Sequence, residues 1–230
     1  MEELCTALAS SSCTRSLKFS NCHITSSSMQ LLCDSLPQTS IQCLAFVSCN
    51  LSNIMSPLSH FISSTSSLEM LSLRCCSLTS CSSFYTSLRT NKSLKALSLF
   101  GCDVDPVNIS QVVRGVCALR YLDLSNTQLD CTHLVKFLDF FKPFEADIDE
   151  RNEIEAFIKQ KKGKGGKVKK GAQNDDFDCK VPTINDGIVE GNQSIMKLDL
   201  RSIFNTNNGR VKSKVTDIKR DLEREIEVLI

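Results

Sequence analysis

The sequence predicts an α/β fold in which short strands and helices alternate and stack into a curved solenoid. Three observations carry this prediction. Cys22, Cys49, Cys76 and Cys102 follow one another at intervals of 27, 27 and 26 residues. Each closes a block with apolar residues at alternate positions, as a half-buried strand requires. Between the blocks apolar residues recur every three or four positions, as one buried face of a helix requires.

Five blocks share the strand pattern. They read TRSLKFSNCHI at 14–24, IQCLAFVSCNL at 41–51, LEMLSLRCCSL at 68–78, LKALSLFGCDV at 94–104 and LRYLDLSNTQL at 119–129. These blocks resemble the leucine-rich repeat, L-x-x-L-x-L-x-x-N/C-x-L, and their period with helical spacers resembles its ribonuclease-inhibitor-like class. Thr14 and Thr127 depart from that pattern. The resemblance implies a parallel sheet on the concave side of a solenoid and helices on its convex side.

The alternation within a block assigns each side chain to one face of the sheet. In the fourth block Leu97 and Leu99 point inward, whereas Ala96, Ser98 and Phe100 point outward. Where the strand ends, some backbone N–H and C=O groups no longer have a hydrogen-bond partner in the sheet, and a small residue is needed whose side chain can bond to them. The four recurring cysteines occupy that position, and we expect all of them to be buried and unreactive.

The spacers between the blocks are expected to be helices. The predicted helical segments are 2–11, 26–38, 53–65, 80–91, 106–116 and 132–144. The first of them looks like the helix of a preceding repeat. Together with the five blocks they define a leucine-rich-repeat solenoid over residues 1–143.

The rest of the chain divides into three predicted regions. Residues 144–189 form a charged insertion, with an acidic helix at 145–162 and a disordered loop rich in lysine and glycine after it. No strand pattern occurs there. Residues 190–209 form a degenerate last repeat, in which Ile195, Leu198 and Leu200 keep the apolar pattern. Residues 210–230 carry apolar residues at alternating intervals of four and three, which predicts an amphipathic helix that caps the solenoid or pairs with another chain.

Composition excludes several classes of function. No run of about 18 apolar residues occurs, and the acidic start lacks the features of a secretory signal, so a cytoplasmic or nuclear protein is expected. Its thirteen cysteines are odd in number and include no C-x-x-C pair, which favours reduced thiols over disulfides or a metal site. His23, His60 and His133 lie on three different repeats. We therefore expect no catalysis, no cofactor and no small-molecule substrate.

A basic segment follows the predicted acidic helix. Its lysines are Lys159, Lys161, Lys162, Lys164, Lys167, Lys169 and Lys170. The spacing of a phosphate-binding loop is absent there. Such lysines attract RNA, DNA or anionic lipid, but no aromatic residue is present to stack on bases. A solvated linker or a nuclear localisation signal is the favoured interpretation, and nucleic-acid or membrane binding stays open as an alternative.

The concave face carries the strongest candidate for a binding site. Equivalent positions of neighbouring strands form columns across a parallel sheet, and these columns gather a mostly apolar patch around an arginine. The patch consists of Val47, Met70, Arg74, Phe100 and Tyr121. Aromatic residues, methionine and arginine are enriched at binding hot spots. The sequence therefore predicts a non-catalytic scaffold that binds a protein partner. A regulator of a small GTPase is the alternative, because GTPase-activating proteins of Ran share this repeat class.

Overall fold

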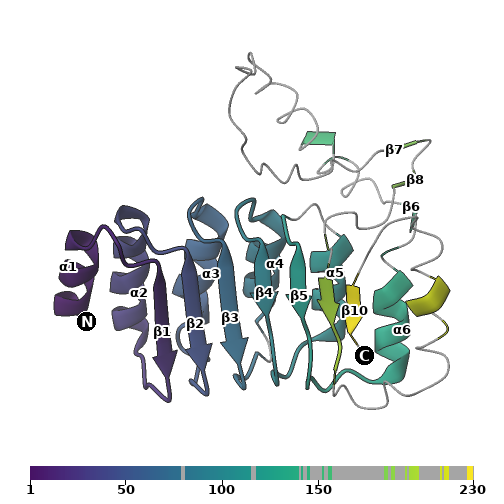
Figure 1. Cartoon of the computed structure of the whole chain (residues 1–230), viewed down its shortest axis with the longest axis horizontal. Coiled ribbons are helices and arrows are strands. Elements are labelled where there is room, and N and C mark those ends of the chain that lie inside the picture. The colour runs from purple at the N-terminus through teal and green to yellow at the C-terminus, as the bar shows by residue number, and fades with distance from the viewer. Residues whose placement is uncertain are drawn as a thin grey trace.

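The computed structural model describes most of the chain up to residue 141 and short stretches beyond it. The described residues are 1–78, 81–114, 118–139, 141, 144–145, 152, 155–156, 184–185, 188–189, 195, 197–201, 213, 215–217 and 227–229. Within them the fold is α/β with a parallel sheet of seven strands (Figure 1). No helix in these ranges is long and apolar enough to cross a membrane.

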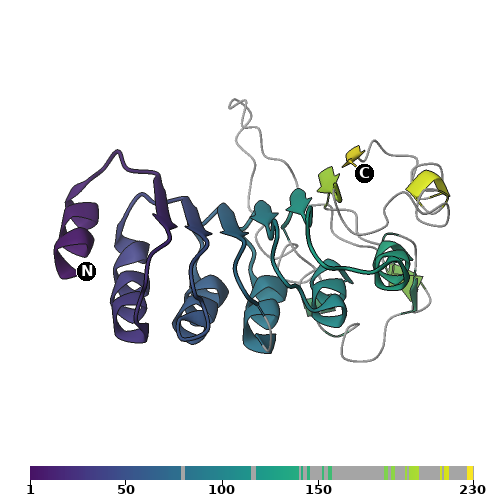
Figure 2. The ribbon, with the colours of Figure 1, turned by 90° about the horizontal axis from the view of Figure 1, so that it is seen from below.

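Strands and helices alternate along the first two thirds of the chain. Their order is α1 (Glu2–Ser10), β1 (Ser16–Ser20), α2 (Ser26–Ser35), the 3-10 helix η1 (Leu36–Gln38), β2 (Cys43–Val47), α3 (Met55–Ser64), β3 (Met70–Arg74), α4 (Ser82–Thr90), β4 (Ala96–Ser98), α5 (Pro106–Arg114), β5 (Tyr121–Asp123) and α6 (Cys131–Asp139). The predicted helices at 2–11, 26–38, 53–65, 80–91 and 106–116 are confirmed with somewhat shorter bounds. The helix predicted at 132–144 is confirmed as α6, which begins one residue earlier, but Phe144 at the end of that prediction lies in the strand β6 (Phe144–Glu145). Helices α2 to α6 lie along one face of the sheet (Figure 2). We call the opposite face the open face.

The core lies between the sheet and these helices. Inward positions of the strands form ladders of fully buried side chains, for example Leu44, Leu71, Leu97, Leu122 and Leu198. The helices complete the core with an apolar stripe each, as their three-to-four spacing predicts. In α4 the stripe consists of Phe84, Tyr85 and Leu88.

The strands β1 to β5 are each followed by the same sharp turn. Asn21, Ser48, Cys75, Gly101 and Asn126 all adopt positive φ, between 51° and 65°. The N–H of each of these residues donates to a carbonyl at the end of the neighbouring strand in the sheet or just after it, so the ladder continues through the turn. This left-handed conformation costs an ordinary residue free energy, and its recurrence shows that the turn itself is the repeating element.

The recurring cysteines follow these turns, and the prediction of their burial is confirmed for three of the four. Cys49, Cys76 and Cys102 are at most 4% exposed, and each thiol lies within 3.1–3.8 Å of a carbonyl oxygen of the preceding strand. Cys22 is exposed, so its predicted burial is wrong. Cys22 follows β1, the first strand, and no described strand precedes β1 to cover the thiol.

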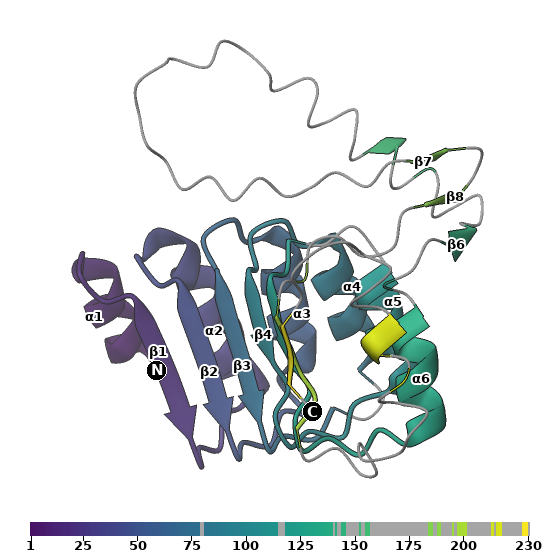
Figure 3. The same ribbon diagram turned by 45° about the vertical axis from the view of Figure 1, so that its right-hand side comes forward.

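The sheet continues beyond β5 through two distant segments. Strand β9 (Lys197–Asp199) pairs with β5, and β10 (Glu227–Leu229) pairs with β9, both in parallel (Figure 3). Ile195, Leu198 and Leu200 are fully buried, as the degenerate last repeat at 190–209 predicts. Residues 190–194, 196 and 202–209 lie outside the described residues.

Two predictions for the C-terminal half need correction. An amphipathic helix through 210–230 is wrong at its end, because Glu227–Leu229 form β10, although residues 213 and 215–217 are helical. Pairing with β9 satisfies backbone groups that would otherwise be left at a sheet edge, and such a tertiary gain overrides a local helical pattern.

The second correction concerns the charged insertion at 144–189. Three short strands, β6 (Phe144–Glu145), β7 (Ile184–Asn185) and β8 (Ile188–Val189), form an antiparallel sheet in the order β6-β8-β7, where no strand was predicted. Glu145 is therefore in a strand and not at the start of the acidic helix; residues 152, 155 and 156 are helical. Two-residue strands carry no detectable alternation in sequence. The loop rich in lysine and glycine lies outside the described residues.

Candidate functional site: a pocket on the open face

The register of the sheet builds the open face from three columns of outward side chains. The first column contains Met70, Ala96, Tyr121 and Lys197; the second contains Ser72, Ser98, Asp123 and Asp199. The third column follows the strand ends and contains Arg74, Phe100, Ser125 and Arg201. Because helices cover only the other face, these side chains point away from the core.

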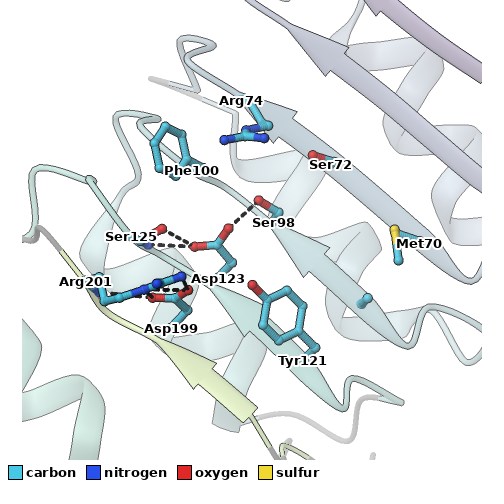
Figure 4. A pocket seen from close by; sticks show the side chains of 11 residues that line it. Met70, Ser72, Arg74, Ser98, Phe100, Tyr121, Asp123, Ser125, Asp199 and Arg201 are labelled. Atoms are coloured by element: carbon cyan, nitrogen blue, oxygen red, sulfur yellow. Dashed lines mark hydrogen bonds and ion pairs between the residues drawn. The ribbon is translucent and has the colours of Figure 1, made fainter. Parts of the chain in front are cut away.

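A pocket of about 320 Å³ lies across β3, β4, β5 and β9 on this face (Figure 4). It is lined by Met70, Ser72, Arg74, Ala96, Ser98, Phe100, Tyr121, Asp123, Ser125, Asp199 and Arg201. Its size suits one or two side chains of a partner or a small molecule.

Arg74 and Phe100 form one end of the pocket. The Cζ atom of Arg74 lies 4.5 Å from the centre of the Phe100 ring, a cation–π contact that orients the guanidinium (Figure 4). Arg74 is exposed, and it makes no ion pair or hydrogen bond through its side chain with the residues that the structure describes. Met70 on the same strand is 46% exposed. This end therefore offers one oriented cation next to apolar surface.

Asp123 lies at the centre of the pocket floor and is 8% exposed. Its Oδ1 accepts hydrogen bonds from the backbone N–H and the hydroxyl of Ser125, and its Oδ2 accepts one from the Ser98 hydroxyl at 2.7 Å. A buried carboxylate needs such donors because it has lost its water. These three bonds use most of the acceptor capacity of Asp123 and fix both serines.

Asp199 and Arg201 form the other end. Asp199 is 2% exposed, and its two oxygens accept from Nε and Nη2 of Arg201 and from the Arg201 backbone N–H, at 2.7–3.2 Å. Burial on its own raises the pKa of Asp199, but the hydrogen bonds and the charge of Arg201 outweigh it and hold that pKa below its usual value. The same bonds raise the pKa of Arg201. This carboxylate is ionised and fully paired.

Tyr121 lines the side of the pocket next to Asp123, and its hydroxyl points into the pocket (Figure 4). Burial raises the pKa of its phenol, and the nearby carboxylates of Asp123 and Asp199 raise it further. The hydroxyl is thus protonated at neutral pH. It has no hydrogen-bond partner among the described residues, so it is available to a ligand.

The structure brings together four of the five residues that the sequence predicts for partner binding. Met70, Arg74, Phe100 and Tyr121 all line the pocket. Val47 does not line it; this residue is half-buried and lies opposite Arg74 in the neighbouring strand. The seven lysines of the predicted basic segment, between 159 and 170, lie outside the described residues.

Sequence reasoning missed the polar floor of the pocket. Asp123, Ser125, Asp199 and Arg201 were not chosen as site residues. A signal for two of them exists, because YLDL at 121–124 and KLDL at 197–200 place an aspartate at the same position of two blocks. Reading the columns through the last repeat would have set these carboxylates side by side.

The side chains of the pocket offer a ligand both polar and apolar contacts. Its lining contains hydroxyls, two carboxylates and two guanidinium groups, with no histidine or cysteine. Among the described residues no three histidines, cysteines or carboxylates gather as metal ligands. His23, His60 and His133 are all exposed and lie on separate elements. No protein-family model matches the chain, and no curated protein sequence matches it.

Proposed function

We propose that this chain is a leucine-rich-repeat solenoid of the ribonuclease-inhibitor-like class and that it binds a protein partner on its open face, without catalysis. The repeat assignment is supported by two regularities: the sequence pattern, and the left-handed turn that closes each of the first five strands. In this assignment the open face corresponds to the concave surface of the solenoid.

One observation carries the functional proposal. The open face presents an oriented arginine, a phenylalanine, an exposed methionine and a tyrosine around one pocket. Arginine and tyrosine are enriched among the residues that dominate binding energy, and phenylalanine and methionine are enriched at protein interfaces. An exposed large apolar side chain is uncommon in the described part of this chain, where Met1, Met70 and Val107 are the only ones. Of these, Met70 lies in the pocket.

Comparing two matched variants tests the proposal. Phe100→Asp places a charge in the pocket, whereas Val107→Asp changes an apolar residue of α5, 63% exposed, on the opposite side of the sheet. Each chain is immobilised and incubated with cell lysate, and quantitative mass spectrometry identifies the proteins that the wild type and each variant capture. We expect a set of proteins retained by Val107→Asp and lost with Phe100→Asp, with similar thermal unfolding for both variants. Identical capture by all three chains would contradict the proposal.

A further inference from the structure

The two ends of the pocket differ in the hydrogen-bonding groups that they leave available to a ligand. Both carboxylates already have partners: Asp123 accepts three hydrogen bonds, and Asp199 is paired with Arg201. Among the polar side chains that line the pocket, those of Arg74, Ser72 and Tyr121 have no hydrogen-bond or ion-pair partner in the described residues, whereas the Arg201 guanidinium is paired with Asp199. A guanidinium can only donate, so the unfilled half of the pocket requires an acceptor.

We propose that this pocket receives a carboxylate side chain from an acidic peptide segment of a protein partner, with Arg74 as its principal contact. The inference rests on the proposed function of the open face and names the chemistry of the partner. Arg74 binds the carboxylate through two parallel N–H groups, which is the geometry that a planar guanidinium favours. The Ser72 hydroxyl, on the same strand and the same face, supplies a further donor.

The surroundings of Arg74 support a peptide as the ligand. The Phe100 ring at 4.5 Å holds the guanidinium in place, so little rotamer entropy is lost on binding. Met70, 46% exposed on the same strand, offers an apolar contact for a residue next to the acid. A peptide with an acidic residue next to an apolar one complements both features.

The carboxylates of the pocket do not oppose this ligand strongly. Asp123 lies two strands away from Arg74, which corresponds to about 10 Å across the sheet, and Asp199 lies three strands away. The screening length at physiological salt is about 8 Å, which is shorter than this separation. The charge of Asp199 is compensated by Arg201 as well. Repulsion from either acid is therefore weaker than the direct contact with Arg74.

Peptide selection on the full chain tests the proposal. Phage-displayed random peptides of about a dozen residues are selected on the wild-type protein, and the recovered sequences are synthesised with a fluorescent label. Binding is then measured by anisotropy on the wild type, on Arg74→Gln and on Lys18→Gln. Lys18 is the matched control, because it is an exposed cation on the open face in β1, outside the pocket.

We expect the selected peptides to share an aspartate or glutamate beside an apolar residue. Arg74→Gln should weaken their binding by about ten- to a hundred-fold, since it removes a charge-assisted hydrogen bond, whereas Lys18→Gln should change it by less than about five-fold. Replacing the acidic residue of the peptide by its amide should weaken binding to the wild type about as much as Arg74→Gln does. The same replacement should weaken binding to the Arg74→Gln variant only a little further.

Other outcomes would overturn the carboxylate assignment. They are selection of peptides without a shared acid, failure to select any peptide, and equal binding to Arg74→Gln. Peptides that lack an acid but lose binding on Phe100→Asp would leave the proposed function standing. Peptides indifferent to both substitutions would remove the open face as the interface. Self-association abolished by Arg74→Gln would make a second copy the occupant and would also refute the assignment.

Discussion

Asn91 links two repeating units, and its replacement by alanine should destabilise the protein strongly. The side chain is 3% exposed. Its Nδ2 donates to the Ile62 carbonyl at 2.6 Å, and its Oδ1 accepts from the Leu94 backbone N–H at 2.7 Å. One side chain thus joins the end of α3 to the segment that leads into β4.

The expected magnitude follows from the groups that Asn91→Ala leaves without a partner. The Ile62 carbonyl and the Leu94 N–H both make buried hydrogen bonds in this position. An unsatisfied buried group costs about 1–3 kcal/mol, so with partial relaxation we expect a loss of about 2–4 kcal/mol in the free energy of unfolding. Asn50 is the control, because it is exposed and accepts a single bond from the Ser52 N–H. Asn50→Ala should cost at most about 0.5–1 kcal/mol.

Urea unfolding followed by circular dichroism measures the free energy of unfolding of both variants. The dependence of that free energy on urea concentration is compared with the wild type. A loss below about 1 kcal/mol for Asn91→Ala, or one equal to that of Asn50→Ala, would show that neither buried group depends on Asn91. The link between the two repeating units would then be carried by the apolar core alone.

Three further predictions concern the turn, the thiols and the pocket. Gly101→Ala should destabilise the protein by about 1–2 kcal/mol in urea unfolding, since φ is +65° and a Cβ would lie 3.0 Å from the thiol of Cys75; an unchanged midpoint would refute this. A maleimide should label Cys22 quickly and Cys102 only on unfolding, because Cys102 is 1% exposed and burial raises its pKa to about 12; equal labelling rates would contradict the fold. Because the pKa of Asp199 is lower in the folded than in the unfolded state, its ionised carboxylate should stabilise the fold at every pH above its unfolded-state pKa. This stabilisation should disappear as the pH falls through its folded-state pKa, and Asp199→Asn should flatten that part of the acid unfolding curve; an unchanged curve would refute it.

The strands and helices up to α6 could be predicted because each is specified locally. The alternation around Leu97 and Leu99 and the spacing within α4 act over a few residues, and both recur in neighbouring units. The α/β class with a parallel sheet follows from that recurrence. The exposure of Cys22 did not follow, because burial of this position depends on a preceding strand, which the repeat pattern presumes.

The distant strands could not be predicted from local pattern. β10 is specified by its pairing with β9, about thirty residues away in the sequence, and its residues continue a helical periodicity that favours another structure. The pocket is a similar case. Arg74, Phe100 and Tyr121 could be aligned in columns within the regular units, whereas Asp199 and Arg201 enter from a segment that follows the insertion.

The polar floor fixes the shape of the pocket through hydrogen bonds. Ser98 and Ser125 are fixed by their bonds to Asp123, and Arg201 is fixed on Asp199. Burying a carboxylate costs free energy unless donors surround it, and the donors to Asp123 and Asp199 offset that cost. The same hydrogen bonds orient the donor side chains on the open face. Arg74 is oriented by Phe100 in the same way. A partner would therefore meet a preformed surface, and little of the binding free energy would be lost in ordering it.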